Sequence, residues 1–178
     1  MKLHLGCRTD ILPKKDGWVN LDIDRELKNV DVFHDLEKMP YPFEDDRADE
    51  IRIWNVLEHI RKPSEVLAEM HRICKNGARV HIKVPHFSQG GMWGDETHVH
   101  GCSINFMEKS IEFSGCEFRV AKKRLNYRQT RAGMGKIGAI QNAVLNPLIN
   151  LDRKIFERYF LYYFGGVEEI EYLLEVVK

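Results

Sequence analysis

Polar residues that could bind a cofactor follow a series of short apolar segments along the chain. They are Gly6 after KLHL, Asp22 within GWVNLDID, Asp35 after NVDVFH, Asn55 after EIRIW, and His86 after HIKVP. In an open parallel sheet, ligands bind at the carboxyl ends of the strands, where the strand order reverses. If these segments are strands of one such sheet, we expect the five residues to lie around one binding site.

The acidic residues of this series are candidates for hydrogen bonds to a bound ligand. A carboxylate at the end of the second segment can accept hydrogen bonds from two ribose hydroxyls. Asp22 is the first candidate for this role, and Asp24 competes because a sequence pattern places a strand end only to within about two residues. A nicotinamide site is not indicated, since G-x-G-x-x-G would need glycines where the chain has Arg8 and Ile11.

Histidines near the same strand ends could act as a general base. The candidates are His59, His86 and His98, and a base is needed only when the group to be modified arrives protonated. A different interpretation is a zinc or iron site formed by His86, His98, His100 and Cys102. The spacing of these four residues matches no compact zinc signature. We therefore expect no bound metal and keep the metal site as an alternative.

Hydrophobic periodicity and turn residues predict the elements that must position these side chains. Strands are predicted at 2–6, 17–24, 29–35, 49–57, 78–85, 116–125 and 169–177. Helices are predicted at 62–77, with Pro63 in the first turn and Gly77 at the end, and at 103–115. The segment 140–166 is apolar and aromatic, and its helical spacing is broken at Pro147.

The alternation of strands and helices predicts an α/β fold with a Rossmann-like, mostly parallel sheet. Only about ten residues separate the first two strands, too few for a full crossover helix, so we expect truncated N-terminal helices. The charged alternation near the C-terminus favours an antiparallel edge strand. We expect a single domain over residues 1–178, with 126–166 as a helical or loop insertion between the last two strands.

Five segments in order resemble the class I S-adenosylmethionine-dependent methyltransferases, and more narrowly the small methyltransferase-like proteins with LNLGCG and VLEHI motifs. The segments are LHLGC, GWVNLDID, DVFHDLEKMPYPFEDDRADEI, WNVLEHI and LAEMHRICKNGARVHIKVPHF, within residues 3–87. The C-terminal GGVEEIEYLLEVVK is similar to the family's closing strand. The resemblance implies a Rossmann-like methyltransferase domain, S-adenosylmethionine as the cofactor, and transfer of its methyl group to an acceptor.

The resemblance also implies which residues bind the cofactor. The positions that match the family's site are Gly6, Cys7, Arg8, Asp22, Ile23, Asp35, Leu36 and Asn55. Gly6 would let the backbone pass close to the methionine and ribose, where a Cβ would clash. Asp35 would contact the adenine amino group and the backbone N–H of Leu36 the adenine ring. Asn55 would lie near the sulfonium.

Arg8 departs from the family's glycine-rich loop, because it stands where the second glycine would fall. A guanidinium beside a sulfonium is unfavourable unless it points away or pairs with the cofactor carboxylate, which it suits as a bidentate partner. We predict a methyltransferase whose acceptor the sequence does not identify. The alternatives are a non-catalytic protein of the same fold that binds S-adenosylmethionine, S-adenosylhomocysteine or a partner, and a metal-dependent enzyme that uses the histidines of 86–102.

Charge and composition give little indication of a macromolecular partner. Lys plus Arg and Asp plus Glu both number 27, so the net charge is zero and does not favour nucleic acid or a membrane. Residues 119–136 are basic, which favours a solvated edge strand and loop, with a docking surface for an anionic acceptor as the alternative. No apolar run has the length of a membrane span, and no signal peptide is visible.

Cysteine usage and the short N-terminus lead to two further expectations. The cysteines at 7, 74, 102 and 116 form no C-x-x-C pair, so we expect reduced thiols in a cytoplasmic protein. The helix that often precedes the first strand in the family is missing here. A face of the sheet is then left uncovered, and we expect a homodimer to cover it.

Overall fold

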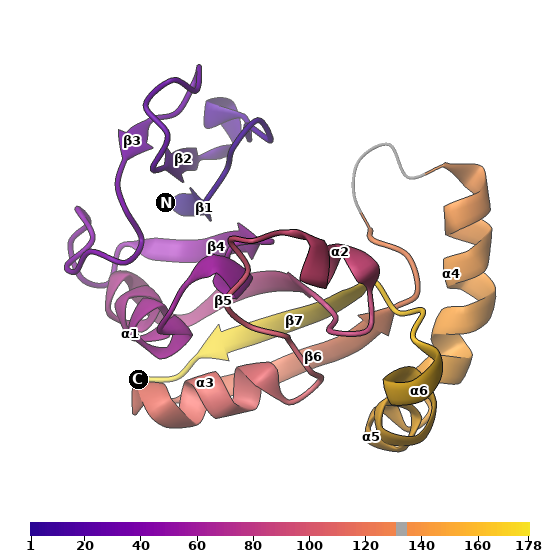
Figure 1. Cartoon of the computed structure of the whole chain (residues 1–178). Helices are drawn as coiled ribbons and strands as arrows, with labels where there is room; N and C mark the ends of the chain where they lie inside the picture. The colour runs from indigo at the N-terminus through magenta and orange to yellow at the C-terminus, as the bar shows by residue number, and fades with distance from the viewer. Residues whose placement is uncertain (131–134) are drawn as a thin grey trace.

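The computed structural model describes residues 1–130 and 135–178, and its seven strands form one sheet (Figure 1). The strands are β1 (Lys2–Leu5), β2 (Trp18–Asp22), β3 (Val32–Phe33), β4 (Ala48–Trp54), β5 (Cys74–Pro85), β6 (Phe118–Asn126) and β7 (Glu169–Val176). Their order is β3-β2-β1-β4-β5-β7-β6, and only β7 runs antiparallel to its neighbours. The predicted α/β fold is confirmed. The antiparallel C-terminal strand lies one position in from the edge, between β5 and β6.

The helices lie mainly in the second half of the chain. They are α1 (Pro63–Ile73), α2 (Gly90–Gly94), α3 (Phe106–Ser114), α4 (Lys136–Ile149), α5 (Arg153–Phe156) and α6 (Tyr162–Phe164). A π-helical turn, η3 (Glu157–Leu161), joins α5 to α6, and the 3-10 turns η1 (Lys14–Asp16) and η2 (Leu57–His59) follow β1 and β4. Residues 6–47 form no α-helix, so the predicted truncation of the N-terminal helices is confirmed.

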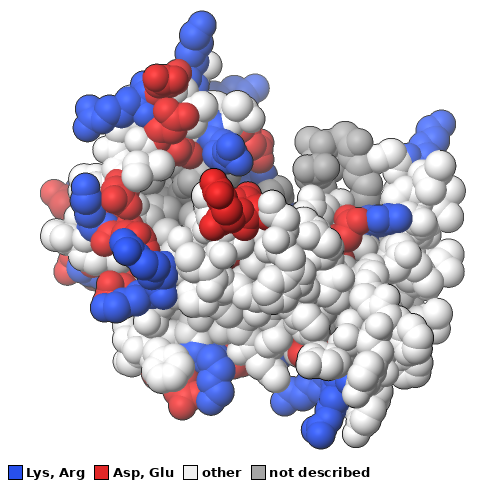
Figure 2. All heavy atoms as spheres, in the orientation of Figure 1, with Lys and Arg blue, Asp and Glu red and all other residues white. Residues whose placement is uncertain are grey.

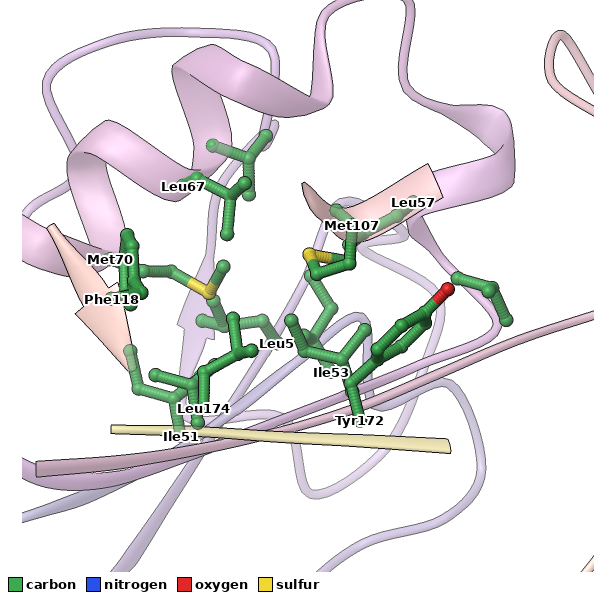
Figure 3. Close-up of a cluster of buried hydrophobic side chains, with 14 of the residues drawn as sticks. Leu5, Ile51, Ile53, Leu57, Leu67, Met70, Met107, Phe118, Tyr172 and Leu174 are labelled. Atoms are coloured by element: carbon green, nitrogen blue, oxygen red, sulfur yellow. The ribbon is translucent and has the colours of Figure 1, made fainter. Parts of the chain in front are cut away.

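One face of the sheet is apolar and packs against α1 and α3. The parallel register places Leu5 of β1 beside Ile53 of β4, and both side chains are fully buried. Figure 3 shows these side chains meeting Leu67 and Met70 from α1 and Tyr172 from β7. Complete burial of each such side chain contributes roughly 1.5–3 kcal/mol. This core fixes the strands whose carboxyl ends carry the candidate site.

The opposite face of the sheet is polar, because alternate residues of the same strands point to it. The Arg52 guanidinium carbon lies 3.3 Å from the centroid of a Trp54 ring, and the Lys83 ammonium lies 3.8 Å from it. Trp54 also packs edge-on against His81, with ring centroids 5.2 Å apart. These cation–π and aromatic contacts stabilise a face that receives no crossover helix from residues 6–47.

The helix predicted at 62–77 begins at Pro63 as expected but ends four residues early, at Ile73. Cys74 is extended and buried, and it already pairs with Ala48 of β4. Gly77 does have the left-handed backbone predicted for a helix end, with φ of 78°, but it lies within β5. The register between β4 and β5 shifts at this point, so the glycine serves an irregularity of the strand. The third strand is also shorter than predicted, at two residues.

Helix α4 turns its polar side to the sheet edge and its apolar side outward. Three asparagines one turn apart, Asn142, Asn146 and Asn150, bond to backbone groups of residues 125, 127 and 128. The helix continues through Pro147, where the sequence predicts a break. Its exposed residues include Ile140 and Val144, and Figure 2 shows few charged side chains over this region. No helix within the described ranges is long and apolar enough to cross a membrane.

Candidate functional site

A cavity of about 570 Å³ opens at the carboxyl ends of β1, β2 and β4. This is the point at which the strand order reverses, because the chain runs from β1 outward to β3 and then returns to β4 on the other side of β1. The lining residues are Gly6, Arg8, Leu21, Asp22, Ile23, Asp24, His34, Asp35, Leu36, Glu37, Asn55, Val56, His59, Ile60, Asp95 and Thr97. Four of the five strand-end residues singled out in the sequence lie here, and His86 does not.

The turn after β1 passes close to the turn after β4. Gly6 has φ of 67°, and a Cβ built on it would lie 2.4 Å from Cγ2 of Val56. A glycine is therefore needed for two reasons, the left-handed backbone and the lack of space. Arg8 also has a positive φ, of 44°, and its exposed side chain is the only Lys or Arg among the described residues of the cavity lining.

Asp22 is held by the backbone at the end of β2. Its Oδ2 accepts a hydrogen bond of 2.7 Å from the N–H of Arg8, and its Oδ1 accepts one of 3.0 Å from the N–H of Asp24. The residue is 5% exposed. Each carboxylate oxygen keeps a further lone pair, so Asp22 can still accept hydrogen bonds from a ligand. Asp24 also lines the cavity, but its Oδ1 accepts the N–H of Glu26 in a local turn.

The segment after β3 supplies the next part of the lining. Asp35 accepts the N–H of Glu37 at 3.0 Å through Oδ1, and Oδ2 lies 3.7 Å from the Lys38 ammonium. Leu36 is buried, while Ile23, which also lines the cavity, is 63% exposed. An exposed apolar side chain in a polar lining is suited to cover the face of an aromatic ring.

Cys7 lies apart from the other predicted cofactor residues. Its side chain is buried and is not part of the cavity lining. The Gly6 and Cys7 N–H groups both bond to the carbonyl of Leu21, which fixes the backbone of this turn. Burial raises the pKa of the Cys7 thiol to about 11. The thiol is thus protonated and packed inside, which does not match a role in contacting the cofactor through the side chain.

The three predicted histidine bases have different surroundings. His59 lines the cavity, and its Nδ1 bonds to Thr97 Oγ1 at 2.8 Å. His98 packs against it, with ring centroids 4.6 Å apart. His86 is fully buried outside the lining, and both of its ring nitrogens are used, by Ser88 and by Glu157. Its position therefore does not fit that of a base at this cavity.

The alternative metal site is not assembled. The His100 ring bonds to a backbone carbonyl, and Cys102 is buried with a thiol pKa raised by desolvation. Within residues 1–130 and 135–178, these two side chains and those of His86 and His98 do not form a set of converging ligands. The structure brings His98 together with Glu58 and His59 instead.

Glu58 is a residue that the sequence analysis does not single out. It is 1% exposed, and its Oε2 has no hydrogen-bond partner among the described residues. Burial raises the pKa of its carboxyl to about 8, and Asp95 adds to the shift through charge repulsion. The only indication of this residue in the sequence is the glutamate of VLEHI. A glutamate at that position is equally typical of an exposed turn.

The basic stretch 119–136 is largely neutralised where it is described. Four of its cations form ion pairs with acids of β7, its preceding loop and α3: Arg119 with Glu175, Lys122 with Glu171, Lys123 with Glu108, and Arg128 with Glu168. Positions 131–134 of the stretch lie outside the described residues. The described part therefore matches a solvated edge strand, and it offers few free cations to an anionic acceptor.

Comparison with known proteins gives one family match. A family model described as a methyltransferase domain matches residues 10–82. This range contains β2, β3, β4, α1 and most of β5, and it therefore includes most of the cavity lining. No curated protein sequence matches the chain significantly.

Solved structures of the same fold span nearly the whole chain. A S-adenosylmethionine-dependent methyltransferase from Archaeoglobus fulgidus is 15% identical, with a TM-score of 0.62 over 98% of this chain and 85% of the other. A methyltransferase in complex with the Trm112 activator of Haloferax volcanii is 16% identical, with a TM-score of 0.63 over 99% and 82%. A phosphoethanolamine N-methyltransferase of Haemonchus contortus, bound to S-adenosylhomocysteine, is 13% identical, with a TM-score of 0.59 over 99% and 48%.

Proposed function

We propose that this chain, which has a methyltransferase domain over residues 10–82 and the fold of the class I S-adenosylmethionine-dependent methyltransferases, binds S-adenosylmethionine in the 570 Å³ cavity and transfers its methyl group. The observation that carries the proposal is the acidic lining at the strand-order reversal. Asp22, Asp24, Asp35, Glu37 and Asp95 face the cavity with one arginine. S-adenosylmethionine carries a sulfonium, an ammonium and two ribose hydroxyls, and all of these groups are favoured by carboxylates.

Each part of the cofactor has a proposed partner in the lining. We assign the ribose hydroxyls to Asp22, which lines the cavity and accepts only one backbone N–H at each oxygen. We assign the adenine to the turn of Asp35 and Leu36. The exposed side chain of Ile23 would cover the adenine ring. Asn55, with φ of 52° at the end of β4, would lie at the methyl end.

Arg8 has a separate proposed role, which is to bind the carboxylate of the cofactor's methionine part. Its side chain is exposed at the cavity and forms no ion pair within the described ranges. S-adenosylmethionine and its decarboxylated analogue distinguish this role from general electrostatics. Arg8→Ala should weaken the binding of S-adenosylmethionine about tenfold or more and leave the analogue nearly unchanged, since only the former offers a bidentate partner. Equal weakening of both ligands would exclude this role.

Methyl transfer from a sulfonium is a displacement on an activated carbon, so the main task of the protein is to orient the two reactants and exclude water. A general base is required only for an acceptor that arrives protonated. Of the three predicted bases, His59 is the one that lines the cavity. The acceptor is an open part of the proposal.

Calorimetry with S-adenosylmethionine and S-adenosylhomocysteine tests the proposal directly. We expect saturable binding of both ligands. The proposal is overturned if neither ligand binds at millimolar concentration. The alternative of a non-catalytic binding protein is motivated by Arg8, which replaces a loop glycine of the family. Binding without turnover across nitrogen, oxygen and carbon acceptors would favour that alternative.

Cytoplasmic location and a homodimer are further proposals. The four cysteines are free thiols, which suits a reducing compartment. The polar face of the sheet is occupied by its own cation–π pairs, so we place the contact between two copies on the exposed apolar side of α4 to α6 instead. A monomeric mass by light scattering at working concentration would exclude the dimer.

A further inference from the structure

Three potential metal ligands converge at the rim of the cavity. A carboxylate oxygen of Glu58 and one ring nitrogen each of His59 and His98 all lie within 4.8 Å of one another. Glu58 and His59 belong to η2, the turn after β4, and His98 belongs to the loop after α2. The N–H groups of Val99 and His100 both bond to the carbonyl of Glu58, at 2.8 and 3.3 Å. The backbone therefore fixes the two segments against each other at this point.

The hydrogen-bond network leaves a lone pair on Nε2 of each histidine. His98 Nδ1 donates to the carbonyl of Met92 at 2.8 Å, so its Nε2 is unprotonated in the neutral ring. The Thr97 hydroxyl donates to Asp95 at 2.6 Å and therefore accepts from Nδ1 of His59. Metal-bound histidines are oriented in a similar way, with the second ring nitrogen donating to a carboxylate, a backbone carbonyl or a water molecule.

Glu58 supplies independent evidence for a ligand at this point. Its side chain is almost fully buried, Oε2 has no hydrogen-bond partner, and no Lys or Arg within the described ranges forms an ion pair with it. A buried carboxylate without a partner is strongly unfavourable, whereas one that coordinates a metal is satisfied. Asp95 stands at the outer side of the group, with Oδ2 3.8 Å from Nε2 of His98.

We propose that Glu58, His59 and His98 bind one divalent transition-metal cation at the rim of the cofactor cavity. Two imidazole nitrogens and a carboxylate oxygen suit Mn²⁺, Fe²⁺ or Zn²⁺, and the nitrogen donors disfavour Mg²⁺ and Ca²⁺. Such a set leaves coordination positions open. Asp95 is near enough to His98 to join the ion or to orient its bound water.

The open positions define a substrate class, and this step rests on the proposed methyl transfer. A cation lowers the pKa of an oxygen bound to it, so the site favours an acceptor with a hydroxyl group. The hydroxyl proton passes to solvent, and the oxygen electron pair forms the new O–C bond. The S–CH₃ bond breaks, and its electron pair stays on sulfur, which leaves as neutral S-adenosylhomocysteine.

Metal binding is tested on the full chain after treatment with a chelator, and without the cofactor. Calorimetric titration with Zn²⁺ and Mn²⁺ should show one site per chain. Glu58→Gln and His98→Gln should each weaken binding about tenfold or more, while His100→Gln, a neighbouring histidine outside the group, should stay within about twofold. Absence of a saturable one-to-one site, or unchanged binding in Glu58→Gln, would overturn the proposal. Circular dichroism confirms that each variant is folded.

Co²⁺ serves as the probe for open coordination positions. Its visible absorption should change when acetohydroxamate, an oxygen ligand, is added to the Co²⁺-loaded chain, and an unchanged spectrum would exclude acceptor binding at the metal. Failure of the metal site and failure of the proposed function are distinguishable. Binding of Mn²⁺ without binding of S-adenosylmethionine would support the metal site and overturn the proposed function. Binding of S-adenosylmethionine without binding of Mn²⁺ would support the proposed function and overturn the metal site.

Discussion

Gly6→Ala is expected to destabilise the protein more than a left-handed backbone alone explains. Gly6 has φ of 67°, and a Cβ at this position would lie 2.4 Å from Cγ2 of Val56. The left-handed conformation costs an alanine about 1–2 kcal/mol, and overpacking against a stiff β-branched side chain adds about 1–3 kcal/mol. We therefore expect the free energy of unfolding to fall by about 2–5 kcal/mol.

Gly115 provides the matched control for this substitution. It has φ of 68°, and a Cβ there would have no neighbour within 4 Å, so Gly115→Ala should cost only the backbone part, about 1–2 kcal/mol. The combined Gly6→Ala and Val56→Ala variant, measured against Val56→Ala alone, should remove the excess. Urea unfolding followed by circular dichroism gives each free energy. Equal losses for Gly6→Ala and Gly115→Ala, or an excess that persists without the valine methyls, would refute the packing argument.

Three further predictions concern the cofactor site, α4 and the acid stability of the sheet. Asp22→Ala should weaken S-adenosylmethionine binding by about 1.5–3 kcal/mol through lost charged hydrogen bonds, with Asp24→Ala as the comparison, and unchanged calorimetric affinity would remove Asp22 from the site. Asn146→Ala leaves a backbone N–H at the sheet edge unpaired and should lower the free energy of unfolding in urea by about 1–3 kcal/mol. Val144→Ala, on the exposed side of the helix, should change it by no more than about 0.5 kcal/mol. A hydrogen bond from a β5 histidine and a β6 lysine hold the pKa of Glu171 at about 2. The ionised carboxylate therefore stabilises the fold on the order of 2 kcal/mol above its ordinary pKa of 4.5, and this contribution is lost as the pH falls from 4.5 toward 2. In Glu171→Gln, the midpoint of urea unfolding should depend less on pH over that interval.

The cavity that we propose for the cofactor could be predicted from the sequence because it is built at strand ends. Strand patterns of four to seven residues fix where Gly6, Asp22 and Asn55 stand. Parallel pairing then brings those positions together. Cys7 follows Gly6 directly, yet its side chain faces the interior. Motif position alone does not give the direction of a side chain, because one residue of displacement in an extended segment reverses the face.

The group of Glu58, His59 and His98 could not be predicted, because its assembly is a long-range event. About forty residues separate η2 from His98, and backbone hydrogen bonds to the Glu58 carbonyl bring the segments together. The outward orientation of α4 has a different cause. The spacing of Asn142, Asn146 and Asn150 is visible in the sequence, but an amphipathic helix ordinarily turns its apolar side toward the core. The unpaired edge of the sheet, which needs hydrogen-bond partners, reverses that assignment.

The short connection from β1 to β2 changes how the proposed cofactor cavity is held in shape. In a doubly wound sheet, the N-terminus of the first crossover helix supplies N–H groups and a partial positive charge at this point, and here residues 6–17 form only the turn η1. Backbone N–H groups of Arg8 and Asp24 are directed at Asp22 instead, and Val56 packs against Gly6. The carboxylate that we assign to the ribose is thus also the group that organises the turn. Loss of Asp22 should therefore affect both binding and the geometry of the turn. Asp22→Asn keeps only one of the two accepting oxygens, because its Nδ2 would face the N–H of Arg8 or of Asp24. The two roles are therefore separated by measuring the free energy of unfolding of an Asp22 variant beside its affinity for S-adenosylmethionine.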